Sequence, residues 1–352
     1  MERSVLLHVH QGQTSFVAKD ARLLSAAFDV RDLPLTWKRK SQLPFLLLKQ
    51  AVQLLFNRHW SAVVVQFAGY HAVLPALMAR FRRKPCFIIT GGTDCVSFPS
   101  LGYGHFSKEP LATMTRISFR LCSHILPVHA SLMQSRNTFQ RNDPVDQGVL
   151  SFMPDLHKPV TEISNGYDPN AWPLSTHAER SVDVITVCSN DRRPSTLRLK
   201  GIPLLLEMAR LRPNLRFCII GLTGAPLAQA PGNVEFLPPV ANHMLPEYYA
   251  RAKVYAQLSL SEGFPNALCE AMLCGCTPLV SAVAAMPMIV GEAGVVLADQ
   301  DPEKAAEHLD LALAKAVSGP DTAARARIAS HFTESMRQEK LIRTIRTAIA
   351  GK

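Results

Sequence analysis

The chain alternates short apolar runs with longer amphipathic segments, and this alternation constrains its fold more than any other feature. Short apolar runs are typical of buried strands, and the segments between them have the residue spacing of helices. The predicted strands are 5–9, 62–67, 86–90, 124–128, 160–164, 182–188, 217–220, 234–237, 254–258 and 278–280, and the helices between them include 16–27 and 111–122. Parallel strands need long crossover connections, which are usually helices. The alternation therefore predicts an α/β fold with parallel sheets.

Turn residues near the middle of the chain divide this pattern into two halves. The sequence NGYDP at 165–169 is rich in turn formers, and polar residues continue to position 180. With 352 residues the chain is long enough for two domains. We predict an N-terminal domain at 1–168, a C-terminal domain at 169–332 and a charged helix at 333–352 that can pack back on the N-terminal domain. Two Rossmann-like, doubly wound domains would face each other across a cleft, where their ligand-binding crevices converge.

Positive charge is concentrated in the N-terminal half. Residues 1–168 carry 19 Lys and Arg against 11 Asp and Glu, a net of +8, which leaves +2 of the total of +10 for the remainder. One basic cluster, Lys38-Arg39-Lys40, precedes the amphipathic segment 42–56, and a second lies at 80–84. Such clusters attract anionic lipid or nucleic acid, or form an ordinary solvated face. Because no nucleic-acid-binding motif accompanies them, we favour an anionic membrane surface as partner and expect no nucleic acid.

The sequence also bears on location and on metal binding. No apolar run reaches the ~18 residues that a membrane span needs, and the N-terminus enters a strand pattern without the features of a signal peptide. We therefore expect a cytoplasmic protein, held at most peripherally at the inner face of the membrane. The eight cysteines are scattered, and the one close pair, Cys274 and Cys276, has no nearby histidine. Neither a metal site nor a bound cofactor is expected.

The segment 259–271, SLSEGFPNALCEA, places two glutamates eight positions apart across a turn. An apolar run precedes it and a helix is predicted to start near Pro265, so Glu262 lies on the turn and Glu270 on the helix. The first N–H groups of a helix have no partners within the helix and together with its dipole form a phosphate site. An ionised carboxylate accepts hydrogen bonds from sugar or ribose hydroxyls. The arrangement therefore fits a nucleotide sugar, which has a polyol at each end and a diphosphate between.

These residues resemble the donor-site signature of family 4 glycosyltransferases, which are retaining enzymes of the GT-B fold. The resemblance extends to LLHVHQGQTSFVAKDARLLSAAFDV at the N-terminus, to ISNGYDPNAW and to NVEFLPPV. It implies an N-terminal acceptor domain, a C-terminal donor domain and a metal-independent transfer that retains configuration. It assigns to catalysis Glu262, Lys200 and Asp94, and to donor binding Gly12, Arg193, Gly263, Phe264, Pro265, Asn266, Ala267 and Glu270.

The sequence around Lys200 departs from the family pattern, and the role of Asp94 is open. Lys200 matches the phosphate-binding lysine, but the family's arginine directly after the preceding strand is missing, and Arg192, Arg193 or Arg198 can replace it. Asp94 follows the predicted strand 86–90 and either contacts substrate or caps the next segment as an ordinary turn aspartate. The loop at 284–288 lacks the acidic residue common in the family, which leaves the donor sugar open.

The leading interpretation is a glycosyltransferase that moves a sugar from a nucleoside diphosphate donor, such as a UDP-sugar or GDP-sugar, to a glycan or lipid-linked acceptor. Bacterial surface polysaccharide or glycolipid assembly is the expected context. A nucleotide-sugar epimerase of the same fold and a non-catalytic nucleotide-sugar-binding protein are the alternatives. Fold alone does not separate these three, so the site residues carry the argument.

Overall fold

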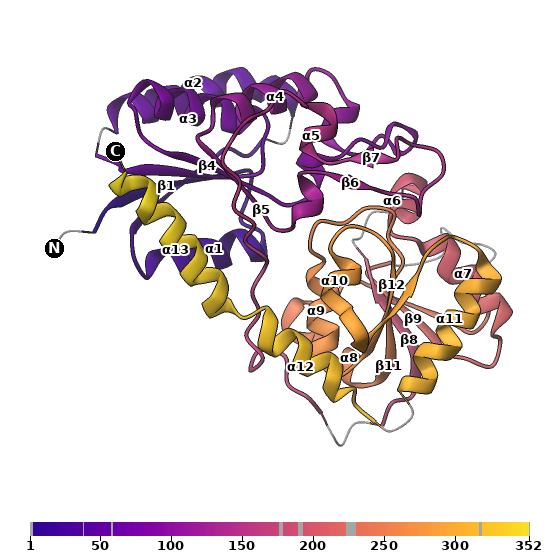
Figure 1. The fold of residues 1–352 in the computed structure, drawn as a ribbon. Helices are drawn as coiled ribbons and strands as arrows, with labels where there is room; N and C mark the ends of the chain where they lie inside the picture. Colours follow the sequence, from indigo (N-terminus) through magenta and orange to yellow (C-terminus); the bar gives the residue numbers. More distant parts are fainter. Residues whose placement is uncertain are drawn as a thin grey trace. The chain divides into compact units, whose positions relative to one another are not determined.

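The computed structural model describes residues 3–37, 39–57, 59–175, 179–188, 193–222, 230–316 and 319–351. The chain folds into two compact units, each with its own sheet and helices (Figure 1). Unit 1 comprises Met1–Ser135, Asp146–Ser164 and Glu334–Lys352, and unit 2 comprises Arg136–Val145 and Asn165–Thr333. The sequence placed the division at 168/169, whereas the units meet at 164/165, and the C-terminal helix belongs to unit 1.

Unit 1 is built on a five-stranded parallel sheet in the order β2-β1-β3-β4-β5. Its strands are β1 (Val5–His10), β2 (Asp29–Pro34), β3 (Ala62–Gln66), β4 (Cys86–Thr90) and β5 (His124–Pro127). Its helices are α1 (Ser15–Ser25), α2 (Leu43–Phe56), α3 (Tyr70–Phe81), α4 (Leu111–Leu121), α5 (Val149–Phe152) and α13 (Glu334–Ala350). Helices α2, α3 and α4 cover one face of the sheet, and α1 and α13 cover the other (Figure 1).

Unit 2 is built on a six-stranded parallel sheet in the order β10-β9-β8-β11-β12-β13. Its strands are β8 (Val182–Val187), β9 (Phe217–Ile220), β10 (Val234–Leu237), β11 (Ala252–Gln257), β12 (Thr277–Ser281) and β13 (Val295–Leu297). Its helices are α6 (Pro194–Leu199), α7 (Ile202–Leu211), α8 (Leu245–Ala250), α9 (Asn266–Leu273), α10 (Met286–Val290), α11 (Pro302–Lys315) and α12 (Thr322–His331). A third, two-stranded sheet consists of β6 (Ser135–Arg136) and β7 (Asp146–Gln147).

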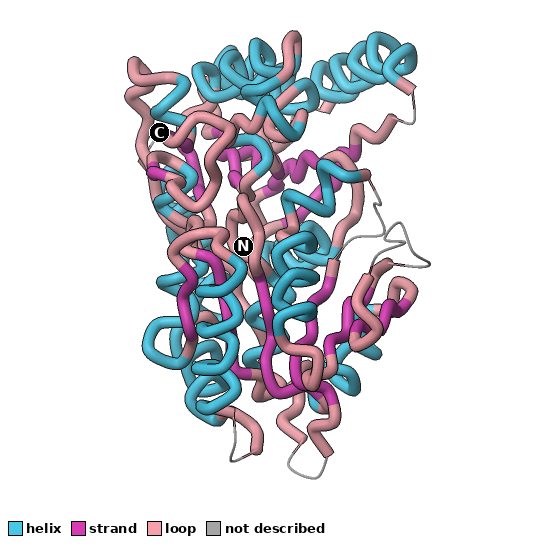
Figure 2. The backbone as a smooth tube through the Cα atoms, turned by 90° about the vertical axis from the view of Figure 1, so that its right-hand side faces the viewer, coloured by secondary structure: helices cyan, strands magenta, loops and turns pink. Residues whose placement is uncertain are grey.

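Both sheets are doubly wound, and Figure 2 shows their strands flanked by helices. Counting strands within each unit, the orders are 2-1-3-4-5 in unit 1 and 3-2-1-4-5-6 in unit 2. In such sheets ligands bind beyond the carboxyl ends of the strands, at the point where the strand order reverses. That point lies between β1 and β3 in unit 1 and between β8 and β11 in unit 2. The topology thus identifies, within unit 2, the edge where a nucleotide is expected.

The predicted strands agree with the structure where apolar runs are continuous. Strands β4, β9 and β10 begin and end as predicted; β4 and β9 are buried throughout and lie between neighbouring strands, whereas β10 is a partly exposed edge strand. The strand predicted at 160–164 is wrong. This segment lies beside β5 and exchanges hydrogen bonds with Ile125 and Pro127, but only the isolated bridge between Ile125 and Val160 forms.

The sequence also missed two strands at sheet edges. Strand β2 has the polar sequence DVRDLP and is mostly exposed, so it shows no apolar run. Strand β13 is only three residues long. Neither has the composition or length that the pattern of buried strands requires. Among the described residues, no helix has the length and apolar character needed to cross a membrane.

Candidate active site

The segment between β11 and α9 forms the candidate site at the switch point of unit 2. Strand β11 ends at Gln257, the turn carries Glu262, and α9 begins at Asn266, directly after Pro265. The N-cap residue, Pro265, makes no side-chain hydrogen bond to the helix. Its first N–H groups therefore remain suited to a phosphate, as predicted from the sequence. Gly263 and Pro265 are buried within the turn, and Ala267 lies in the first turn of the helix.

Glu262 and Lys200 form an ion pair at this edge. The Lys200 Nζ donates to Glu262 Oε1 at 2.6 Å, and their side chains are 28% and 12% exposed. The same Oε1 accepts from Gln257 Nε2 at 3.1 Å. Tyr255 donates to Gln257 Oε1 at 2.9 Å, which fixes the amide with its nitrogen toward the glutamate. The structure thus joins two predicted catalytic residues, 62 positions apart in sequence, through a buried glutamine that the sequence analysis missed.

A glycine allows Lys200 to reach this position. Helix α6 ends at Leu199, Lys200 follows it, and Gly201 has a φ of 71° before α7 begins. A Cβ at Gly201 would lie 2.1 Å from the backbone oxygen of Leu258, which leaves no room for a side chain. The N–H of Leu260 also donates to the carbonyl oxygen of Leu199 at 2.8 Å. Close contact between these backbones therefore holds the lysine beside the Glu262 turn.

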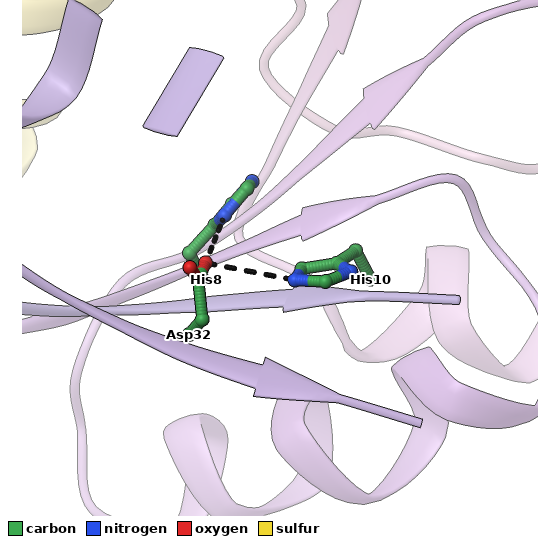
Figure 3. A group of neighbouring side chains, drawn as sticks. All are labelled: His8, His10 and Asp32. Atoms are coloured by element: carbon green, nitrogen blue, oxygen red, sulfur yellow. Dashed lines mark hydrogen bonds and ion pairs between the residues drawn. The ribbon is translucent and has the colours of Figure 1, made fainter. Parts of the chain in front are cut away.

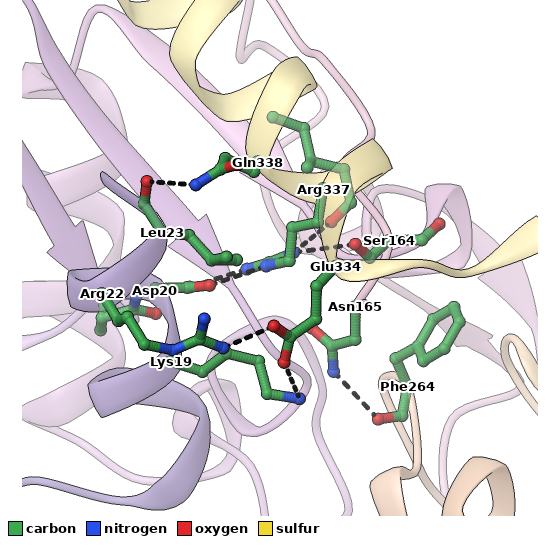
Figure 4. Close-up of polar contacts among 12 residues, drawn as sticks. Lys19, Asp20, Arg22, Leu23, Ser164, Asn165, Phe264, Glu334, Arg337 and Gln338 are labelled. Carbon is green, nitrogen blue, oxygen red and sulfur yellow. Dashed lines mark hydrogen bonds and ion pairs between the residues drawn. The ribbon is translucent and has the colours of Figure 1, made fainter. Parts of the chain in front are cut away.

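The first residue of α9 is held by residues from the start of unit 2. Asn266 Oδ1 accepts from Tyr167 OH at 2.7 Å and from Asn165 Nδ2 at 3.2 Å. Asn165 also donates to the carbonyl oxygen of Phe264 at 3.4 Å (Figure 4). The Phe264 ring is buried and stacks on Tyr167, with 6.4 Å between ring centroids. The side chains of Phe264 and Asn266 therefore fix the turn, and their backbone groups are the candidates for donor contact.

Glu270 lies on α9 as predicted and is half-buried. Burial raises the pKa of Tyr249 and Tyr255 well above the usual value, and the nearby charge of Glu270 adds to the effect in both. Burial likewise raises the pKa of Tyr167, and the charge of Glu270 adds to this effect. The charge of Glu270 therefore acts on three buried tyrosines, and the residue lies one helical turn after the start of α9.

Arg193 and Lys200 lie at opposite ends of helix α6. Arg193 is exposed and precedes α6, whereas Lys200 follows the same helix. Because six residues of helix lie between them, the two Cα atoms are about 10 Å apart. Arg198 is exposed near the end of α6, and Arg192 lies outside the described residues. Which arginine assists Lys200 stays a prediction.

In unit 1, Gly12 lies just beyond β1. Its φ is 155°, and the nearest atom to an added Cβ would be Thr36 Cγ2 at 3.7 Å. Backbone conformation rather than crowding therefore favours glycine here, and the space above it stays open. The Gly12 N–H donates to His10 Nδ1 at 3.2 Å, which ties the loop to the strand.

Asp94 is fully buried at the carboxyl edge of the sheet in unit 1. Its carboxylate accepts from the N–H of Ala68 at 3.0 Å and from those of Gly91 and Gly92 at 3.3 Å. Burial raises the pKa of Asp94, while His105 and these N–H groups act in the opposite direction. The carboxylate thus holds the loops after β3 and β4 together. These contacts are made to preceding residues rather than to the next segment, so both roles that the sequence left open, capping that segment and contacting substrate, stay predictions.

His8, His10 and Asp32 form a group of metal-binding side chains in unit 1 (Figure 3). Their ligand atoms lie within 4.8 Å of one another, and His8 Nδ1 donates to Asp32 Oδ1 at 2.8 Å. His8 Nε2 lies 3.3 Å from Gln66 Nε2, and that amide nitrogen also donates to Asp20 at 2.8 Å. If the Gln66 amide were rotated by 180°, its oxygen would face the Asp20 carboxylate, and two hydrogen-bond acceptors would lie against each other. Gln66 therefore donates to His8 Nε2, the proton of His8 resides on Nδ1, and His8 does not fit as a metal ligand.

Comparisons with known proteins agree with this site. Residues 189–315 match the family model described as Glycosyl transferases group 1. The O-antigen chain mannosyltransferase B of Escherichia coli is 35% identical over 78 residues, which cover 22% of this chain and 20% of that protein. The aligned part thus spans about a fifth of this curated relative.

Solved structures match the chain over almost its whole length. Sucrose-phosphate synthase from Thermosynechococcus elongatus has a TM-score of 0.70 at 13% identity, covering 99% of this chain and 100% of that one. HepE from Anabaena, solved in complex with UDP and glucose, has a TM-score of 0.68 at 15% identity, covering 98% and 100%. At such identities these matches show the fold, which is GT-B. Residues 189–315 are thus similar to group 1 glycosyltransferases, and the chain as a whole has the GT-B fold, with two doubly wound α/β units.

Proposed function

We propose that the protein transfers a sugar from a nucleoside diphosphate donor to a glycan or lipid-linked acceptor in bacterial surface polysaccharide or glycolipid assembly. The observation that carries this proposal is the Lys200–Glu262 ion pair beside the uncapped start of α9, at the switch point of unit 2. The name of the Escherichia coli relative supports a polysaccharide context, and the UDP and glucose bound to HepE support a nucleotide sugar as donor.

The donor is held by three kinds of group in this proposal. The N–H groups at the start of α9 and the Lys200 ammonium bind the diphosphate, because both offer positive charge and hydrogen-bond donors. Glu262 accepts from hydroxyls of the donor sugar. Glu270, further along α9, accepts from the ribose hydroxyls. Lys200 has three N–H donors, so it can bind phosphate oxygens while one donor keeps Glu262 in place.

The transfer step breaks the bond between the anomeric carbon and the diphosphate oxygen and forms a bond to the acceptor oxygen. The departing diphosphate takes the proton of the acceptor hydroxyl, and attack on the same face retains the configuration. Lys200 and the helix dipole stabilise the developing negative charge in place of a metal ion. The expectations of a cytoplasmic location and of a UDP-sugar or GDP-sugar belong to the same proposal.

Two assays separate this proposal from its alternatives. Thermal unfolding in the presence of UDP, GDP and ADP identifies the base, since a ligand at about 100 times its Kd stabilises the protein by about 2.7 kcal/mol. Release of free nucleoside diphosphate from the matching sugar is then measured with and without acceptor glycans. A transferase releases the nucleotide in step with acceptor glycosylation. Interconversion of the sugar without release would indicate an epimerase, and binding without either reaction would indicate a binding protein.

Matched glutamate variants test the two carboxylates. Glu262→Gln should lower the transfer rate at least about a hundredfold with nucleotide affinity retained, because the acid positions the sugar. Glu270→Gln should weaken binding of the free nucleoside diphosphate, because it loses the ribose contact. Glu247→Gln, on the exposed surface of α8, is the control and should change neither value. Full activity of Glu262→Gln would refute the donor-site assignment.

A further inference from the structure

Unit 1 exposes an apolar stripe on helix α2. Its residues are Phe45, Leu48, Val52, Leu55 and Phe56, of which Phe45 is 70% exposed and Phe56 83% exposed. At 100° per residue these five positions fall within an arc of about 100° on the helix. The opposite side of α2 packs inward through Gln50 and Leu54, and Gln50 donates to the backbone oxygen of His71. The outward stripe is therefore not needed for the core of unit 1.

Helix α3 extends the apolar surface. It packs against α2 and exposes Leu77 and Phe81, with Phe81 at 83% (Figure 1). Seven of the eleven exposed large hydrophobic residues in the described part of the chain lie on these two helices. Single exposed apolar residues are normal, but a concentration of this kind marks an interaction surface. We name these seven residues the α2–α3 patch.

The segment of the chain that forms the α2–α3 patch carries charge of one sign. Residues 33–93 contain nine Lys and Arg and no Asp or Glu. The Arg39, Lys49, Arg80 and Arg83 side chains are exposed, and no acidic side chain pairs with them among the described residues. Arg82 has a structural task instead, because it donates to the backbone oxygens of Leu55 and Asn57 at the end of α2. Lys38 and Arg58 lie outside the described residues.

From this combination we infer that the α2–α3 patch docks unit 1 on an anionic lipid bilayer, with the apolar stripe entering the headgroup region and the surrounding cations contacting lipid phosphates. An amphipathic helix with aromatic and aliphatic residues on one face and basic residues beside them binds bilayers in this way. A second copy of the chain would bring two uniformly positive surfaces together, which charge repulsion opposes. A nucleic acid would leave the exposed Phe and Leu side chains without an apolar partner.

Vesicle binding by the full chain tests this inference. Vesicles of phosphatidylcholine alone are compared with vesicles containing about a third phosphatidylglycerol. The protein should sediment with the anionic vesicles, and binding should fall steeply between about 0.05 and about 0.5 M salt because the Debye length shortens. Removing one cation should lower the partition coefficient about fivefold, since about 1 kcal/mol is lost per residue and about 1.4 kcal/mol corresponds to tenfold.

Two variants separate the apolar and the basic contributions. A stripe variant carries Phe45→Ser, Leu48→Ser and Phe56→Ser, and a charge variant carries Arg39→Gln, Lys49→Gln, Arg80→Gln and Arg83→Gln. Each should lose at least about a hundredfold in vesicle binding. The control variant carries Leu311→Ser on α11 and Lys340→Gln on α13, both exposed, and should bind as the unchanged protein does. Circular dichroism confirms that all variants fold.

Several results would overturn the inference. These are equal binding to both vesicle types, no binding to either, or undiminished binding by the stripe variant. Concentration-dependent dimerisation that the stripe variant abolishes would assign the patch to a second copy of the chain. Retention on duplex DNA, lost in the charge variant but not in the stripe variant and without vesicle binding, would assign it to nucleic acid. The inference depends on unit 1 alone, so its failure is distinguishable from failure of the proposed transfer reaction.

Discussion

Replacing Arg337 by methionine should destabilise unit 1 strongly. Arg337 lies on α13 and makes two hydrogen bonds of 2.7 Å to the two carboxylate oxygens of Asp20 on α1. These side chains are 3% and 2% exposed, and Arg337 also donates to the backbone oxygens of Ile163 and Ser164 (Figure 4). The Arg337→Met variant leaves a buried carboxylate whose remaining hydrogen-bond donor among the described residues is Gln66. Breaking a buried ion pair in this way costs about 3 to 5 kcal/mol.

The loss of unfolding free energy in Arg337→Met should depend on pH. Burial alone would raise the pKa of Asp20, but the charge and hydrogen bonds of Arg337 hold it below the usual value. The stabilising contribution of Asp20 is therefore present above its unfolded pKa and is lost as the pH falls through the lower folded pKa. In Arg337→Met burial prevails and raises the pKa of Asp20, so protonation relieves the buried charge. The difference in unfolding free energy between the two proteins should thus narrow as the pH falls from 7 toward about 4.

Urea unfolding followed by tryptophan fluorescence measures this effect in unit 1. Trp37 and Trp60 lie in unit 1 and Trp172 in unit 2, so a Trp172→Phe background confines the signal to unit 1. The control is Arg343→Met on the same helix. Arg343 forms an exposed ion pair with Glu339, with 3.7 Å between the charged atoms. Such an exposed pair contributes less than about 1 kcal/mol to the free energy of unfolding. A loss below about 1 kcal/mol in Arg337→Met, or a difference that does not narrow in acid, would refute the reasoning.

Three further outcomes are expected. Gly201→Ala should lower transfer and thermal stability together, because the added Cβ meets the Leu258 backbone, whereas Gly232→Ala, with open space around it, should change neither. Burial lowers the pKa of His71 to about 4, so its imidazole should stay neutral from pH 8 down to about 5 in an NMR titration; a midpoint near 6.5 would contradict its burial. Transfer should persist in EDTA and fall strongly in Lys200→Met with or without EDTA; an absolute requirement for magnesium or manganese would contradict the proposed role of Lys200.

The sequence by itself determined the α/β class, most strands and the residues of the Glu262 turn. These features are local: a buried strand needs an apolar run, and the start of a helix needs a particular turn, so both are visible within a few residues. Strands β4 and β9, which are buried along their whole length, agree at both ends for this reason. The exposed strand β2 and the segment 160–164 did not follow the pattern, because pairing at a sheet edge depends on the neighbouring strand rather than on apolar composition.

Only the tertiary structure decided which side chains act together. Lys200 contacts Glu262 because strands β8 and β11 are neighbours in the sheet. Gln257, at the end of β11, also donates a hydrogen bond to Glu262, although the rest of that strand has the apolar sequence of a buried strand. Asp94 accepts hydrogen bonds from the N–H groups of Ala68 and Gly91 and so connects two loops, while its contact with substrate stays a prediction. Such pairings join positions far apart in the chain, and single-sequence periodicity carries no information about which distant segments become neighbours.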